Sequence, residues 1–145
     1  MTVLQAIRTR LLAQPPLTTL VAARVYTLTL PQNFDGPNAI RLVRVSELGL
    51  SHLRGTTGLT PLRLQVDTFV REGAGDAYDQ ACAIDAAARG TFVAGVATGL
   101  AGFRGTVNGI GFTGILPMDT REQYHGDEHR MVRVLSEYRV WFTQE

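Results

Sequence analysis

The sequence predicts an α+β domain, in which a mainly antiparallel sheet packs an N-terminal helix and one long helix on one face. Three observations lead to this fold class. Apolar residues recur at helical spacing at the start of the chain and in its middle, and the other apolar segments alternate with polar residues as strands do. Elements in this order pack best as a sheet with its helices on one face. The length of 145 residues fits a single domain over residues 1–145.

The first helix is predicted directly after Thr2. Thr2 and Gln5 have the spacing of a capping box, which satisfies two backbone donors at a helix start. Apolar residues then repeat at helical spacing as far as Leu11, and the proline pair that begins at Pro15 ends the helix. Residues 17–24 could add a second short helical turn.

Three strands are predicted in the first half of the chain. Residues 24–30 are rich in β-branched and aromatic side chains. Residues 39–47 do not alternate cleanly, which predicts a bulge or a strand buried on both faces. Residues 62–71 alternate most clearly and place Asp67 on the polar face, where we expect it to be solvated or ion-paired.

A long helix is predicted in the middle of the chain. Asp76 occupies the N-cap position, and apolar residues then recur at helical spacing through Leu100. We therefore expect one helix from about Ala77 to about Gly99, with Gly90 as the place for an interruption.

Two strands are predicted after the long helix, separated by a polar segment. Apolar residues after position 107 indicate a strand that ends at Pro117. The polar segment, residues 119–130, is predicted as a loop or hinge. Residues 131–142 then alternate as a long C-terminal strand with one mainly apolar face.

Composition excludes several classes of function. All fourteen basic residues are arginines, so a Schiff-base or P-loop lysine is excluded. Thirteen acidic residues bring the net charge to +1, which argues against a dedicated nucleic-acid-binding protein. Cys82 is the only cysteine, so a disulfide framework is excluded. Charged residues make up 19%, below the average of about 25%, which suggests that something else, such as other copies of the chain, covers part of the surface.

No targeting or membrane segment is expected. Arg8 and Arg10 interrupt the apolar pattern of the N-terminus, so it does not read as a signal peptide. The longest uncharged stretches fall short of the roughly 20 apolar residues that span a bilayer. We therefore expect a soluble protein made in the cytoplasm.

The motifs that could carry chemistry are weak, so we expect no enzyme and no cofactor. Residues 109–114 match G-x-G-x-x-G, but Pro117 follows where a dinucleotide site needs a helix. No serine lies in G-x-S-x-G. A metal site remains an alternative, and so does a pair of converging carboxylates. The residues concerned are His125, Asp127, Glu128 and His129 for the metal, and Asp67, Asp79 and Asp85 for the carboxylates.

Five arginines form the candidate interface. Arginine is favoured at interfaces because its planar guanidinium can make two hydrogen bonds to one carboxylate or phosphate. The alternative is that these arginines lie on solvated strand faces. The candidate interface residues are Arg41, Arg44, Arg54, Arg63 and Arg71.

Several short segments resemble the tail-completion family of long-tailed bacteriophages and phage-like particles, also called tail-terminator or tail-to-head joining proteins. The likeness spans most of the chain, and residues 90–114 depart from it because they are longer and richer in glycine. The segments that carry the likeness are residues 20–26, 30–32 with Pro37, 64–69, 78–84 and 137–142.

The resemblance implies a structural virion protein without catalytic chemistry. Such proteins form a ring, usually a hexamer, that caps the tail tube, ends tail growth and joins the tail to the head connector. The implied partners are other copies of the chain, a tail-tube protein and a head-connector protein, and DNA passes through the lumen without sequence-specific binding. The implied location is the head-proximal end of the tail, after assembly in the host cytoplasm.

Two alternatives stay open beside this reading. The chain could be another head–tail connector or a tail-tube component, or else a small metal-binding domain. Long loops in a compact domain are usually functional or mobile, so residues 48–61 and 119–130 are the expected contact loops.

Overall fold

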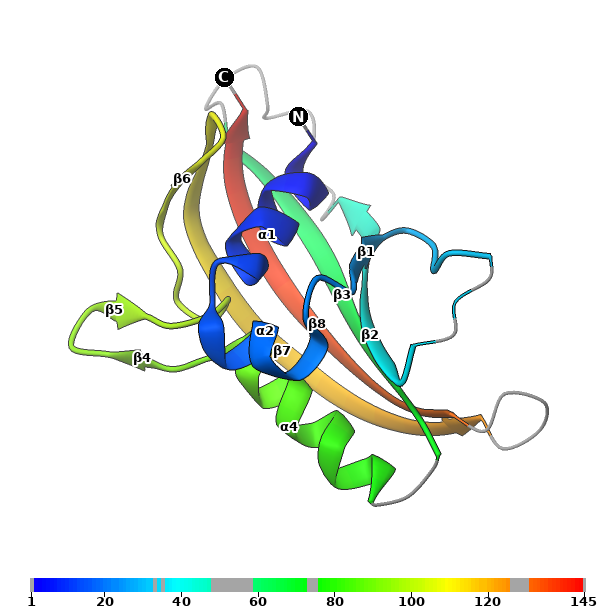
Figure 1. Cartoon of the computed structure of the whole chain (residues 1–145). Coiled ribbons are helices and arrows are strands. Elements are labelled where there is room, and N and C mark those ends of the chain that lie inside the picture. Colours follow the sequence, from blue (N-terminus) through cyan, green and yellow to red (C-terminus); the bar gives the residue numbers. More distant parts are fainter. Residues whose placement is uncertain are drawn as a thin grey trace.

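The computed structural model of the chain describes residues 2–32, 34, 36–47, 59–72, 76–125 and 131–144. Over these residues it forms three helices and a six-stranded sheet, which is an α+β architecture (Figure 1). The helices are α1 (Val3–Leu12), α2 (Pro15–Val21) and α4 (Ala77–Arg89).

The sheet is mainly antiparallel, as predicted, with the strand order β1-β2-β3-β8-β7-β6. Only β1 runs parallel to its neighbour β2. The strands β4 and β5 form a separate two-stranded hairpin. The strand bounds are Val25–Thr27 (β1), Asn38–Glu47 (β2), Leu59–Arg71 (β3), Phe92–Val93 (β4), Val96–Ala97 (β5), Gly105–Val107 (β6), Ile110–His125 (β7) and Met131–Gln144 (β8).

The start of α1 confirms the predicted capping box. The Gln5 backbone amide donates to the Thr2 hydroxyl at 3.2 Å, and the Gln5 side chain accepts from the Thr2 amide at 2.9 Å. Pro15 comes after the end of α1, as predicted, and it is also the first residue of α2. A proline is well tolerated in a first helical turn, where its missing amide hydrogen would have no helical partner.

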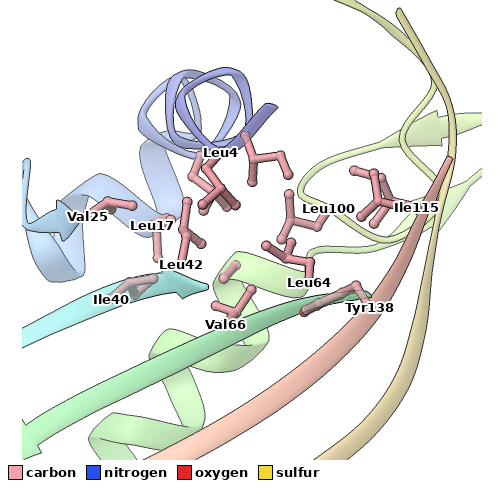
Figure 2. Close-up of a cluster of buried hydrophobic side chains, with 14 of the residues drawn as sticks. Leu4, Leu17, Val25, Ile40, Leu42, Leu64, Val66, Leu100, Ile115 and Tyr138 are labelled. Carbon is pink, nitrogen blue, oxygen red and sulfur yellow. The ribbon is translucent and has the colours of Figure 1, made fainter. Parts of the chain in front are cut away.

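One hydrophobic cluster joins the three helices to the sheet. Figure 2 shows Leu4 of α1 and Leu17 of α2 directed towards Leu42 and Leu64 of the strands. Complete burial of one such side chain contributes about 1.5–3 kcal/mol. The largest fully buried side chains of the cluster include Tyr138, Phe142, Ile7, Leu11, Leu17, Ile40, Leu42, Leu64 and Ile84.

The long helix ends earlier than predicted, at Arg89. The next residue, Gly90, has a φ of 68°, and a Cβ atom there would lie 2.3 Å from the Gly99 nitrogen. The chain returns to this point because the Leu100 amide donates to the Ala88 carbonyl at 3.0 Å. The expected helix over residues 90–99 is therefore wrong, because a glycine-dependent crossing replaces it with the β4–β5 hairpin.

The strand β7 is longer than predicted. It continues through Pro117 to His125, so residues 119–125 are strand and not the expected loop or hinge. Two register shifts, at Phe112/Gly114 and at Pro117/Asp119, accommodate the irregular sequence. After the residues that pair with β6, β7 has β8 as its one neighbour among the described strands, so this part of β7 is an edge strand. An edge strand with bulges tolerates a proline. Residues 126–130 lie outside the described residues.

Two further predictions concern β2 and the connection behind it. The prediction for β2 was a bulge or a strand buried on both faces, and the register shift between Arg44 and Ser46 agrees with the bulge. Of the expected contact loop over residues 48–61, residues 59–61 belong to β3 and the rest lies outside the described residues.

Candidate interaction surfaces

The side chains of β3 and β8 divide between two faces of the sheet. Leu64 and Val66 point into the hydrophobic cluster, so their neighbours Arg63 and Asp67 point to the other side. We call this other side the open face. Its members on β2, β3 and β8 include Arg41, Arg63, Gln65, Asp67, Phe69, Arg71, Arg133, Glu137 and Arg139, which the strand register places side by side.

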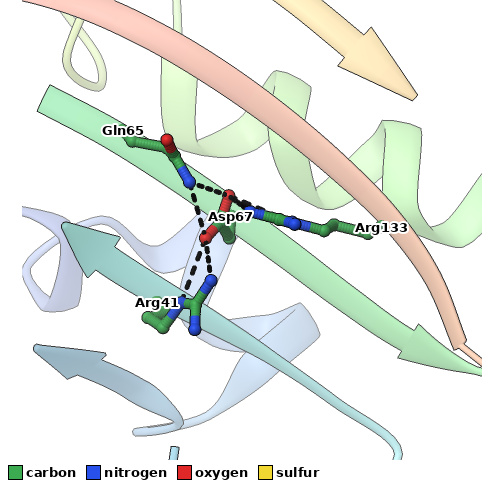
Figure 3. A network of polar contacts seen from close by, with 4 residues as sticks. All are labelled: Arg41, Gln65, Asp67 and Arg133. Carbon is green, nitrogen blue, oxygen red and sulfur yellow. Dashed lines mark hydrogen bonds and ion pairs between the residues drawn. The ribbon is translucent and has the colours of Figure 1, made fainter. Parts of the chain in front are cut away.

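A buried carboxylate organises one half of the open face (Figure 3). Asp67 is fully buried, and its oxygens accept from Arg41 at 2.6 Å and 3.0 Å and from Arg133 at 3.0 Å. Gln65 donates to the same carboxylate at 2.9 Å. Asp67 is thus ion-paired, as one of the two expectations had it, and it is not solvated. A buried charge is tolerated only with such partners.

Aromatic rings extend this arrangement into a pocket. The Phe69 ring lies 5.3 Å from the Arg41 guanidinium and 5.7 Å from that of Arg133. The Arg71 guanidinium donates to the Phe34 carbonyl at 2.6 Å and lies 5.7 Å from the Phe34 ring. The cavity between them has a volume of about 410 Å³ and is also lined by Leu30, Pro31, Gln32 and Met131. The pocket thus combines apolar side chains with three arginines, Arg41, Arg71 and Arg133.

Two arginines face each other in the other half of the open face. Arg63 of β3 and Arg139 of β8 are direct cross-strand partners. The only carboxylate paired with either arginine within the described chain is Glu137, 3.8 Å from the Arg63 Nε atom. Both Nε atoms are buried and lack a hydrogen-bond partner among the described residues. Like charges placed directly opposite destabilise a sheet, so this pair favours an external anion.

The five arginines of the candidate interface do not all come together. Arg41, Arg63 and Arg71 share the open face. Arg44 pairs in register with Leu64, which places it on the helix-covered side. Arg54 lies outside the described residues. Sequence reasoning missed Arg133 and Arg139, although the alternation of residues 131–142 put both on the less apolar face.

An acidic cluster lies at the N-terminal end of α4. Asp76 caps the helix by accepting from the Asp79 amide at 3.2 Å, and the Tyr78 hydroxyl donates to Glu122 of β7 at 2.9 Å. Hydrogen bonding to Asp76 and repulsion from its charge raise the pKa of Asp79. The hydrogen bond to Glu122 is the main cause that raises the pKa of Tyr78 to about 12. We call Asp76, Tyr78, Asp79 and Glu122 the acidic end of α4.

A polar cluster ties α4 to β8 on the helix-covered face. The Ser136 hydroxyl donates to Asp85 at 2.6 Å, and Arg89 donates to the same carboxylate at 2.8 Å. The Asp85 carboxylate is thus shared by the Ser136 hydroxyl and the Arg89 guanidinium, which fastens α4 to β8. Asp67 lies on the opposite face, so the carboxylates Asp67 and Asp85 do not converge.

The β4–β5 hairpin is a surface that the sequence analysis missed. The hairpin extends away from the rest of the molecule (Figure 1). Phe92, Val93 and Val96 expose 55–66% of their surface on it. Arg10 fastens its base by donating to the Ala97 carbonyl at 2.7 Å, and burial lowers the pKa of Arg10. An exposed apolar patch of this kind is typical of an interaction surface.

The metal alternative has no support in the part of the chain that the structure describes. Within it, no group of three or more His, Cys, Asp or Glu side chains could hold an ion. Asp127, Glu128 and His129 lie outside the described residues, and of His125 only the backbone position in β7 is described. No helix of the described residues is long and apolar enough to cross a membrane.

Comparison with known proteins finds no family model and no curated protein that matches the sequence. A solved structure, the virion of a native gene transfer agent particle, contains a similar chain with a TM-score of 0.71 and 17% sequence identity. The match covers 97% of this chain and 94% of that chain. Over almost its whole length, the protein therefore has the fold of a chain from a gene transfer agent virion.

Proposed function

We propose that the protein is a structural virion component of the tail-terminator type, which forms a ring and has no catalytic activity. The observation that carries this proposal is the likeness, over 97% of the chain, to a chain from the virion of a native gene transfer agent particle. The resemblance of the sequence to tail-completion proteins points the same way. Residues 1–145 act as one domain in this proposal.

The ring caps the tail tube and presents its opposite side to the head connector. A ring of identical subunits joins two different surfaces of neighbouring copies, so each copy must carry two complementary patches. The open face and the acidic end of α4 are two surfaces of opposite charge in the same chain. We propose a hexamer at the head-proximal end of the tail, assembled in the host cytoplasm, with DNA passing through its lumen without sequence-specific contacts.

The interface of this ring includes the arginines of the open face. Arg41 is held by Asp67, whereas Arg63 and Arg71 reach the surface with weaker or main-chain partners. Guanidinium groups near aromatic rings are common anchors of protein interfaces. Arg54, which follows β2 and precedes β3 in the sequence, belongs to the same proposal.

The mass of the purified protein in solution tests this function. Light scattering at several protein concentrations, with and without tail tubes, should show a closed ring or a monomer that becomes a ring on the tubes. A chain that stays monomeric at every concentration and ignores the tubes would contradict the proposal.

A second candidate is another connector or a tail-tube subunit, because the similar chain belongs to a whole virion particle. A terminator and a tube subunit differ in whether assembly continues after they have bound. A terminator binds the end of preformed tubes and adds no further rings, whereas a tube subunit polymerises by itself. Electron microscopy of the protein alone and of capped tubes separates them.

A further inference from the structure

Charges without a close ion pair collect at two separate places in this chain. On the open face, Arg139 forms no hydrogen bond or ion pair with a described residue, and Arg63 has only Glu137 at 3.8 Å. At the acidic end of α4, neither Asp79 nor Glu122 forms an ion pair within the described residues. A chain with fourteen basic and thirteen acidic residues thus keeps part of each charge uncompensated.

Both places are unfavourable in the isolated chain. Arg63 and Arg139 are direct cross-strand neighbours of equal charge, and their Nε donors are buried without an acceptor. Asp76 and Asp79 crowd two carboxylates into one helical turn, which the raised pKa of Asp79 reflects. Each arrangement becomes favourable when an opposite charge approaches from outside.

The two places lie on opposite faces of the sheet. Glu122 pairs in register with Val134, which belongs to the hydrophobic cluster, so Glu122 lies on the helix-covered side. Arg63 and Arg139 point to the open face. Surfaces on opposite faces cannot meet within one chain, but they meet head to tail between copies, as a closed ring requires.

We propose that the Arg63–Arg139 pair of one copy receives the acidic end of α4 from the next copy. This inference rests on the proposed ring and names its interface. The carboxylates of Asp79 and Glu122 supply acceptors to the two guanidiniums, and Tyr78, an exposed aromatic side chain, packs between them. A carboxylate partner on a second copy is favoured over a nucleic acid because Asp79 and Glu122 of the same chain are exposed and form no ion pair with a described residue.

Two charge reversals test the contact without weakening the fold. Arg139→Glu replaces a repulsive neighbour of Arg63 by an attractive one, and Asp79→Arg does the same beside Asp76. Arg139→Glu should therefore unfold at the same temperature as the wild type or above it. Asp79→Arg should unfold close to the wild-type temperature, because the lost repulsion from Asp76 offsets the cation placed in the first turn of α4. Each alone should raise the concentration needed for half-assembly by at least about tenfold, because like charges then face each other across the interface.

Mixing the two variants gives the decisive measurement. In an alternating ring every contact pairs opposite charges again, either the native pair or the reversed one. An equimolar mixture of Arg139→Glu and Asp79→Arg should thus assemble at the wild-type concentration, although each variant alone needs the higher one. Arg104→Glu is the matched control, because Arg104 is exposed and lies in neither patch, and it should assemble normally.

The outcomes separate this inference from the proposed function. A wild-type ring together with unchanged assembly of both single variants overturns the contact and leaves the ring standing. A wild type that never forms a ring, even on tail tubes, overturns both. Unchanged rings in which Arg139→Glu instead loses salt-dependent binding to duplex DNA would show that the arginine pair serves a nucleic acid, and this too overturns the contact.

Discussion

The two faces of β3 and β8 are built from alternating residues of the same strands, yet they follow different rules. On the helix-covered face, Val66 and Phe142 belong to a continuous hydrophobic cluster. On the open face, Asp67 (next to Val66 in sequence) and Trp141 (next to Phe142) lie on the side that carries the arginines. Asp67 forms ion pairs with two of these, Arg41 and Arg133. One face is stabilised by apolar area, the other by a few directional contacts.

Within this one sheet, we therefore expect the helix-covered face to stabilise the fold of a single chain and the open face to serve association between chains. The side chains of the hydrophobic cluster shield one another from water, so the helix-covered face needs no further partner. The open face does not, because Arg63 and Arg139 repel each other and lack acceptors in the described chain. Substitutions on the first face should therefore change the free energy of unfolding, and most substitutions on the second should change assembly.

The largest effect is expected from Phe142→Ala on the covered face. Removal of this almost wholly buried ring leaves a cavity and should lower the free energy of unfolding by about 4 kcal/mol in denaturant titrations. Trp141→Ala is the matched control, since Trp141 is the half-buried neighbour on the open face. An equal loss for both variants would abolish the distinction between the faces.

Asp67→Ala is the exception expected on the open face. It removes the acceptor that Arg41, Arg133 and Gln65 share and should cost about 3 kcal/mol of unfolding free energy. Asp119→Ala breaks the exposed pair with Arg121 and should change stability by less than about 0.5 kcal/mol. Thermal melts that shift equally for both variants would show that burial of the ion pair is irrelevant.

A smaller effect is expected from Gly90→Ala, where α4 ends. The backbone conformation of Gly90 is almost restricted to glycine, so the substitution should cost about 2 kcal/mol. Gly95→Ala has a similar φ of 79° but no atom within 4 Å of its Cβ position, so it reports strain alone. Urea denaturation should rank Gly90→Ala as the more damaging change, and the reverse order would refute the close crossing with Gly99.

The smallest effect concerns the pH dependence at the acidic end of α4. Because the pKa of Asp79 is raised in the folded chain, the folded state binds this proton more tightly than the unfolded state does. The contribution of Asp79 to stability therefore falls as the pH rises from the ordinary carboxyl pKa through the raised one. Asp79→Asn should flatten the melting temperature over that range, and an unchanged pH profile would exclude the repulsion.

Much of the fold follows from local patterns in the sequence. The Thr2–Gln5 capping box and the alternation of β3 and β8 are short-range signals, and each was read correctly. The prediction of a helix over residues 90–99 was wrong because Phe92, Val96 and Leu100 have helical spacing, although only Leu100 of the three is buried. The spacing is accidental there, and the conformation of Gly90 decides the path.

The candidate surface was harder to predict because it depends on strand pairing. Arg63 was recognised, but its partner Arg139 lies 76 positions further along the chain, and only the register of β3 and β8 brings them together. The polar residues 119–125 gave no strand signal, since an edge strand with few buried side chains resembles a loop in composition. Ion pairing was one of the two expectations for Asp67, but nothing in the sequence named Arg41 and Arg133 as its partners.

The position of β8 in the sheet has a consequence for how the chain acquires its structure. β8 follows all other described strands in sequence, yet it lies between β3 and β7. Until residues 131–144 have been synthesised, β3 and β7 each have one edge with unpaired backbone groups. The residues of β3 pair with residues of β8 that lie, on average, about seventy positions further along the chain. Pairings over such separations form slowly. The sheet is therefore completed only after residues 131–144 have been synthesised, and a nascent chain that stalls before β8 exposes two strand edges on which aggregation can begin.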